Sequence, residues 1–249
     1  MHSALLNYFK FNNARTLTTG EPSQLAIHQF DHITALVDPT RQFDNQVIIH
    51  DACDNEEVVE ALVLYQNSFY PEVRIAPSAQ ALKLGSFLSN SDFHYMYDID
   101  WLVLLASDYQ AGEQTSIRVE RWQSAQVDDF RALLKTSGVQ CADDIWQQKR
   151  VMYCTEQFRC FVAYIEDQPV AWATSFIDDS HTAILANAFT QPLARNKGCH
   201  TALLHARIQD AIALGCTTIL SDVMPESTSA ENCKKVGFVS QQVDMVWVK

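Results

Sequence analysis

The chain has 249 residues, 47% hydrophobic and 19% charged, and its 18 basic and 30 acidic side chains give a net charge of −12. A chain of this length can bury most of its apolar surface without disulfides or a structural metal, and the length fits one large domain or two small ones. Nucleic-acid binding needs clustered lysine and arginine, so the scattered cations and the excess of anions argue against it.

No segment predicts a membrane span or a targeting signal. The chain lacks an uninterrupted run of roughly 20 apolar residues, and residues 1–7 lack the basic and apolar regions of a signal peptide. We therefore expect a cytoplasmic protein without a membrane partner. Its seven cysteines include no C-x-x-C pair. They indicate reduced thiols packed as small hydrophobic side chains and predict no metal site.

The first half gives its clearest pattern toward its end. Residues 56–65 predict a helix and 73–75 a strand, Pro77 and Ser78 begin a helix that runs to Leu88, and residues 93–105 are extended. The polar segment 107–115, punctuated by Gly112, indicates a boundary. We accordingly expect two domains, 1–112 and 113–249.

The second half is strongly periodic. Helices are predicted at 128–135 and 143–150, and strands at 161–165, 170–176 and 182–190. A helix at 200–214, which Gly215 ends, and a strand at 216–220 come next. A helix at 229–236 and one or two closing strands over 238–248 complete the chain's predicted elements. The predicted order is helix, helix, three-stranded meander, helix, strand, helix, strand. The end of the first half follows the same helix–strand–helix–strand order, which indicates a weak internal repeat.

A loop between a predicted strand and an amphipathic helix has the features of an anion site. Backbone N–H groups at a helix start point outward, and the helix dipole adds positive potential there. Gly198 permits close approach of the backbone to a ligand, while Arg195 and Lys197 supply charge. The loop therefore favours a phosphate or pyrophosphate, although a glycine before a helix also has a purely structural role.

This loop and a later motif together resemble one family. Arg195-x-x-Gly198-x-His200 is followed by Ser229-x-x-Asn232 and then by Gly237-Phe238. The pattern resembles the GNAT superfamily of acyl-CoA N-acyltransferases, and within it a bacterial subgroup whose front half is a degenerate copy of the same fold. The resemblance covers residues 117–249 well and the first half loosely.

The resemblance implies a mixed α/β sheet in a tandem GNAT-like architecture, with a complete C-terminal acyltransferase domain. The degenerate N-terminal half would lack a CoA site, because its corresponding stretch, residues 50–57, is acidic. This half would pack against the second and shape an acceptor pocket between them. We expect a monomer or a homodimer, which binds no nucleic acid.

The same resemblance assigns an acetyl-CoA site. Backbone N–H groups of residues 196–201 would bind the pyrophosphate. Backbone groups at the end of the predicted strand 182–190 would bond the pantetheine arm. One N–H there could stabilise the oxyanion that develops on the thioester carbonyl during attack. Asn232 would contact the cofactor or cap its helix. The implied cofactor-binding residues are Phe189, Thr190, Arg195, Asn196, Lys197, Gly198, Cys199, His200, Thr201 and Asn232.

The implied reaction is direct attack of a primary amine, on a small molecule or a protein, on the thioester of acetyl-CoA in a ternary complex. Two residues depart from the family pattern: His200 replaces the usual Gly or Ala, and Cys233 replaces a Tyr that protonates the leaving thiolate in many members. Cys233 is either a proton donor or a packed thiol. Asp222 is the candidate base or a solvated acid at a strand end. A non-catalytic acyl-CoA-binding sensor or regulatory protein is the alternative function.

Overall fold

The computed structural model describes residues 3–66, 68–77, 81–112 and 116–249. Its first half contains helix α1 (Ser3–Arg15), strands β1 (Ala26–Gln29), β2 (Ile33–Val37) and β3 (Gln46–Ile49), helix α2 (Asn55–Val63), strand β4 (Glu72–Ile75), helix α3 (Ala81–Asn90) and strand β5 (His94–Leu105). The elements predicted at 56–65, 73–75 and 93–105 are confirmed. The predicted helix start at Ser78 lies outside the described residues.

The second half contains strand β6 (Arg118–Trp122), helices α4 (Val127–Lys135) and α5 (Asp143–Lys149), strands β7 (Phe158–Ile165), β8 (Gln168–Asp178) and β9 (Thr182–Thr190), helix α6 (Cys199–Ala213), strand β10 (Thr218–Val223), helix α7 (Thr228–Lys235) and strand β11 (Val239–Val248). The predicted order is wrong at its start, because β6 precedes the two helices. This strand lies at the edge of the sheet, and its exposed Arg118 and half-buried Glu120 obscure the apolar pattern.

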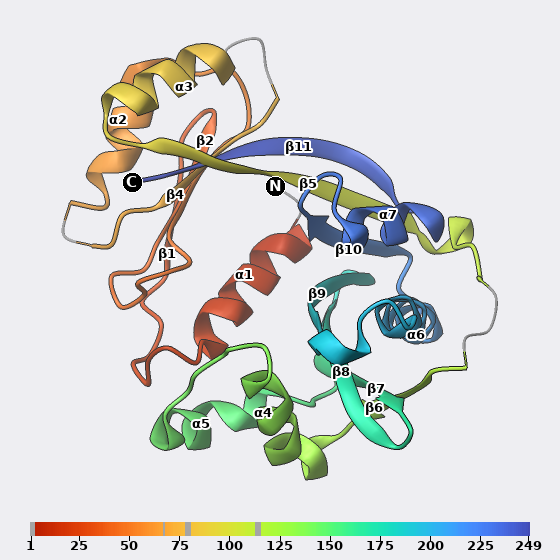
Figure 1. Cartoon of the computed structure of the whole chain (residues 1–249). Coiled ribbons are helices and arrows are strands. Elements are labelled where there is room, and N and C mark those ends of the chain that lie inside the picture. The colour runs from red at the N-terminus through yellow and green to blue at the C-terminus, as the bar shows by residue number, and fades with distance from the viewer. Residues whose placement is uncertain (1–2, 67, 78–80, 113–115) are drawn as a thin grey trace.

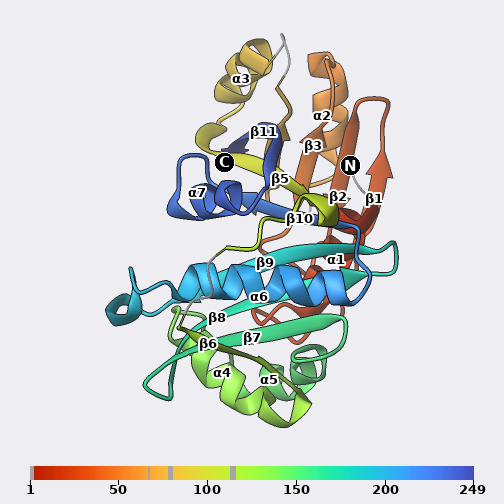
Figure 2. The ribbon, with the colours of Figure 1, turned by 90° about the vertical axis from the view of Figure 1, so that its right-hand side faces the viewer.

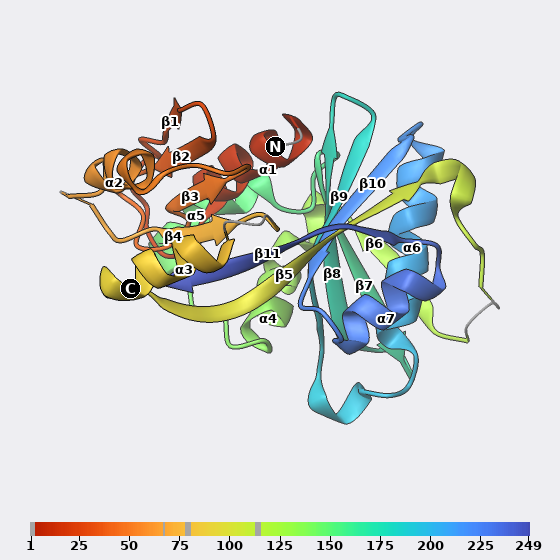
Figure 3. The same ribbon diagram turned by 90° about the horizontal axis from the view of Figure 1, so that it is seen from above.

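The strands form one 11-stranded sheet in the order β1-β2-β3-β4-β11-β5-β10-β9-β8-β7-β6. Each half contributes a parallel pair, β3 with β4 and β9 with β10, followed by a helix and a long strand. The predicted repeat is therefore present in the arrangement of the elements. The two halves surround a central pair of long strands, β5 and β11 (Figure 3).

The two halves exchange these final strands. Strand β5 of the first half pairs with β10 of the second, while β11 of the second half pairs with β4 of the first, and β5 and β11 pair with each other. The sheet is thus continuous across the predicted boundary between residues 112 and 113. That boundary remains a prediction, because residues 113–115 lie outside the described part of the chain.

The sheet of the second half is covered on both faces. In β7, Phe158, Cys160 and Val162 pack with residues of α1, α4 and α5, whereas Phe161 and Ala163 pack with α6. Figure 2 shows α6 lying across these strands. Because successive side chains of a strand point to opposite faces, burial of both faces explains the continuous apolar run in β7.

Helix α1 belongs to the core of the second half although it begins the chain. The Phe11 ring lies 5.3 Å from that of Phe158 and 5.1 Å from that of Phe176, and the Tyr8 ring lies 5.5 Å from that of Phe176. The helix therefore lies between the two arms of the curved sheet (Figure 1). All seven cysteines are free and six are buried, as predicted. No described helix is long and apolar enough to span a membrane.

Candidate active site

The site begins where two neighbouring strands separate. Strands β9 and β10 pair only over residues 182–185 and 218–221. Toward β8, the ladder carries a bulge at Asn187, since Ala186 pairs with Thr174 and Ala188 pairs with Ala173. Beyond Leu185, the edge of β9 that faces β10 has no strand partner in the described chain.

A cavity of about 1110 Å³ opens at this separation. It extends from the loop before α6, past the free edge of β9, to helix α1 and the inner surface of the first half. The lining from the second half includes Phe189, Arg195, Asn196, Gly198, His200, Thr201, Arg207, Asp222, Asn232 and Cys233, and the lining from the first half includes Tyr8, Asp44, His50, Arg74 and Trp101. One continuous cavity therefore joins the predicted cofactor loop to the first half.

The loop before α6 presents unpaired donors, as its sequence predicts. Gly198 is the N-cap of α6 with φ of +86°, and an added Cβ would meet open space. The first backbone bond of the helix runs from the Ala202 N–H to the Gly198 carbonyl, at 2.9 Å. No described carbonyl accepts a hydrogen bond from the N–H groups of residues 196–201. Arg195 and Lys197 are exposed beside them, so the loop fits an anion.

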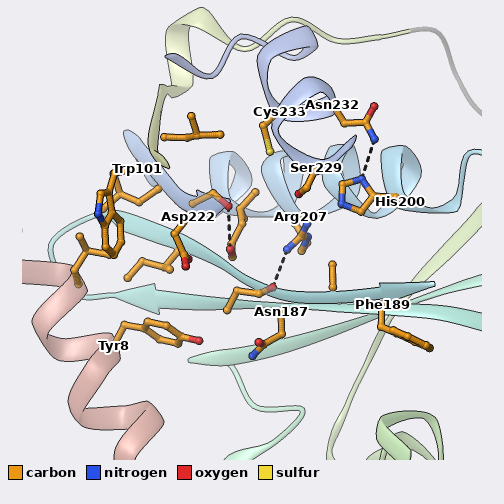
Figure 4. Close-up of a pocket in the computed structure, with 18 of the residues that line it drawn as sticks. Tyr8, Trp101, Asn187, Phe189, His200, Arg207, Asp222, Ser229, Asn232 and Cys233 are labelled. Atoms are coloured by element: carbon orange, nitrogen blue, oxygen red, sulfur yellow. Dashed lines mark hydrogen bonds between the residues drawn. The ribbon is translucent and has the colours of Figure 1, made fainter. Parts of the chain in front are cut away.

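His200 turns toward α7 rather than into the loop. The Asn232 side-chain amide donates to His200 Nδ1 at 3.1 Å (Figure 4). Burial, together with the charge of Arg207, lowers the pKa of His200 to about 4, so the imidazole is neutral at pH 7. The capping role considered for Asn232 is wrong: Ser227 is the N-cap of α7, and its hydroxyl accepts from the Ala230 N–H.

Two side chains replace the ladder bonds that β9 loses where it leaves β10. The Ser221 hydroxyl donates to the Leu185 carbonyl at 3.3 Å, and Arg207 Nη1 donates to the Ala186 carbonyl at 3.0 Å. Without such donors these buried carbonyls would be left unsatisfied. The sequence reasoning missed Arg207. Its signal was a lone charge on the apolar face of the helix, beside Leu204 and Ile208.

The two predicted catalytic residues differ in their surroundings. Cys233 is 2% exposed, and burial raises the pKa of its thiol to about 11. Asp222 follows the part of β10 that pairs with β9, pairs with Trp101 of β5 and lines the cavity. Its side chain is exposed to the cavity, and the protein that surrounds the cavity still desolvates the carboxyl, which raises its pKa.

The first half supplies polar groups that sequence reasoning missed. The Trp101 indole N–H donates to Asp244 at 2.7 Å, and the Arg74 guanidinium lies 5.7 Å from the centre of the Trp101 ring. Figure 4 shows Tyr8, Trp101 and Asp222 around the same space. These residues come from distant segments and form no local motif. Among the described residues, no group of three or more His, Cys, Asp or Glu side chains could hold a metal ion.

Comparison with known proteins identifies the family. Residues 119–238 match the model of the Acetyltransferase (GNAT) family. This domain therefore belongs to the GNAT superfamily of acyl-CoA N-acyltransferases. No curated protein matches the chain.

Solved structures extend the fold to the first half. A GCN5-related N-acetyltransferase from Kribbella flavida is 12% identical with a TM-score of 0.66, over 90% of this chain and 88% of its own. A GCN5-related N-acetyltransferase from Sphaerobacter thermophilus is 12% identical with a TM-score of 0.62, and the match covers 87% of this chain and 76% of that protein. A tandem GNAT protein from the clavulanic acid biosynthesis pathway is 9% identical with a TM-score of 0.58, and the match covers 86% of this chain and 77% of that protein. The predicted tandem GNAT-like architecture is confirmed.

Proposed function

We propose that the protein transfers an acetyl group from acetyl-CoA to a primary amine of a small molecule or a protein, by direct attack in a ternary complex. The observation that carries this proposal is the single cavity that links the N–H-rich loop at 196–201 with the free edge of β9 and the polar surface of the first half. A donor and an acceptor can therefore enter one space from two ends.

The loop end would hold the donor. The N–H groups of residues 196–201 would bind the pyrophosphate, with Arg195 and Lys197 adding charge. Backbone groups at Phe189 and Thr190 would bond the pantetheine arm, because the facing edge of β9 has no strand partner among the described residues. Acetyl-CoA supplies the thioester, and a backbone N–H on this part of β9 would stabilise the developing oxyanion.

The opposite end would hold the acceptor and the base. Attack requires a neutral amine, and a carboxylate with a raised pKa takes a proton more readily than an ordinary one. Asp222 meets this requirement, because it lies in the cavity and desolvation raises its pKa. The amine proton would pass to Asp222 directly or through one water. Trp101 and Tyr8 would border the acceptor.

A specific observation also favours the alternative of an acyl-CoA-binding protein without catalysis. The thiol of Cys233 is buried, and its raised pKa makes it a weak proton donor. A chain that has lost the acid of its family could keep the binding site alone. Binding without transfer is the outcome that would identify this alternative.

Calorimetric titration with acetyl-CoA tests the binding step. Wild-type protein should bind, and both Arg195→Ala and Gly198→Asp should weaken binding, the latter at least about tenfold, or about 1.4 kcal/mol. Gly215→Asp is the matched control. Gly215 follows the other end of α6 with φ of +82° and open space around it, so backbone strain is similar while the cavity is untouched.

Release of CoA with a panel of amines then separates the two functions. Amine-dependent release by the wild type supports transfer. Tight binding with no release for any amine supports the sensor. Failure of the wild type to bind acetyl-CoA, or equal weakening by the Gly198 and Gly215 variants, would overturn the cofactor site.

A further inference from the structure

Helix α6 carries a buried cation, Arg207, that has no ion-pair partner in the described part of the chain. Arg207 is 3% exposed. Its Nε donates to the Leu203 carbonyl at 3.2 Å, and its Nη1 donates to the carbonyls of Thr174 and Ala186 at 3.2 and 3.0 Å. No carboxylate among the described residues forms an ion pair with it, and its Nη2 has no hydrogen-bond partner there.

A buried charge without an opposite charge beside it is costly even when carbonyls accept its hydrogen bonds, so the presence of Arg207 here needs an explanation. The other buried arginine of this domain, Arg159, forms ion pairs with two carboxylates. Burial lowers the pKa of Arg207 only to about 10, so it remains a cation at neutral pH. Since Arg207 lines the cavity, its missing counter-charge can come from a bound ligand.

The position of Arg207 selects which part of the ligand it would face. It lies eight residues beyond the first residue of α6, or about 12 Å along the helix axis, and is therefore remote from the N–H groups of the loop. Its guanidinium instead contacts β9 beside the bulge at Asn187. It also lies near Cys233, where its positive charge opposes the rise in the pKa of the thiol that burial causes. Figure 4 shows it between α6 and the free edge of β9. In the proposed complex the pantetheine arm runs from the loop along this edge of β9, so the sulfur would lie at this end of the donor site.

We infer that Arg207 is the counter-charge for the CoA thiolate that leaves during transfer, an inference that rests on the proposed function. The amine nitrogen forms a bond to the thioester carbonyl carbon, the C–S bond breaks with its electron pair on sulfur, and the nitrogen loses a proton to Asp222. The thiolate is stabilised by Arg207 until it takes a proton from solvent, to which Asp222 releases the proton that it took from the amine. An acid at position 233 is then unnecessary, and a thiol in place of the family's Tyr is tolerated.

The test compares free CoA with acetyl-CoA by calorimetry at pH 7 and pH 9. A thiol with a reference pKa of about 8.5 ionises between these values, whereas the thioester has no proton to lose. In the wild type, the affinity for CoA relative to acetyl-CoA should rise about tenfold, the equivalent of one pKa unit. Arg207→Met should abolish the rise, and Arg207→Lys, which keeps the charge, should retain most of it.

The ratio of the two affinities separates this effect from other titrations. Besides Arg207, the cavity is lined by titratable groups from every surrounding element: Cys199 and His200 on α6, Cys233 on α7, Asp222 on β10, Asp244 on β11, Tyr8 on α1, and Asp44, His50 and Arg74 of the first half. Contributions that these groups make equally to both ligands cancel in the ratio, and a merely structural role of Arg207 would weaken both ligands equally.

A ratio that stays constant with pH in the wild type would overturn the inference even if every variant failed to fold. So would a rise that survives in Arg207→Met. Absence of acetyl-CoA binding by the wild type at both pH values would instead show that the proposed function itself is wrong.

Discussion

At the scale of single residues, Asp222 is the group whose chemistry can be tested most directly. We expect Asp222→Asn to lower kcat/KM for the amine about 100-fold or more, within the range for loss of a general base, while the affinity for acetyl-CoA stays unchanged. Steady-state kinetics and calorimetry would measure the two quantities. Asp179→Asn, at an exposed turn residue outside the cavity lining, is the matched control. A rate equal to that of the control would exclude Asp222 as the base.

The pH dependence of the same variant has a definite sign. Desolvation raises the pKa of Asp222, so the carboxylate form is present above that raised value and is lost as the pH falls through it. In the wild type, kcat/KM should therefore fall on the acid side, and this limb should be missing in Asp222→Asn. Ionisation of the amine acceptor affects both proteins alike. A limb that persists in the variant would belong to the acceptor or to another group.

Site residues could be predicted from the sequence where the signal is local. The loop around Gly198 combines a turn glycine, two cations and a helix start within a few residues, and its residues 195, 196 and 198–201 line the cavity, whereas Lys197 does not. Trp101 and Tyr8 reach the same cavity only through long-range pairing of β5 and packing of α1. No pattern in one sequence specifies such contacts, so the acceptor side of the site was missed.

At the scale of elements, the second half follows from its periodicity and the first half does so only in part. Helix α6 and strand β9 are long and strongly patterned, and their predicted bounds agree with the structure. Strand β2 has five residues that are all buried, and β1 has four that are mostly exposed. Neither strand alternates between apolar and polar residues, so the period of two that marks a half-buried strand is missing.

Helix α1 gives an element-scale prediction about stability. Phe11→Ala should reduce the free energy of unfolding by about 2–3 kcal/mol, because the ring contacts Phe158 and Phe176 but is only partly buried, and a fully buried Phe costs ~3–5 kcal/mol. Urea unfolding would measure the difference. Lys10→Ala, an exposed neighbour on the same helix, should change the free energy by less than about 0.5 kcal/mol. Equal effects of the two substitutions would mean that α1 is not part of the core.

At the scale of the whole molecule, strand exchange makes the two halves interdependent. A fragment of residues 113–249 lacks β5, which pairs with both β10 and β11 in the centre of the sheet, and it also lacks α1. It lacks β4 as well, the other neighbour of β11. One edge of β10, both edges of β11 and the apolar surface beneath α1 would then be exposed, and such edges favour aggregation.

We therefore expect this fragment to lack cooperative thermal unfolding when it is expressed alone, and to regain it when residues 1–112 are co-expressed as a separate chain. Circular dichroism melting and size-exclusion chromatography would measure both states. A lone fragment that unfolds cooperatively and binds acetyl-CoA like the full chain would contradict the prediction. If the fragment is unfolded, its lack of activity says nothing about the acceptor, because the cofactor site is lost with the fold. The role of the first half in acceptor binding must then be tested with substitutions such as Trp101→Phe in the intact chain.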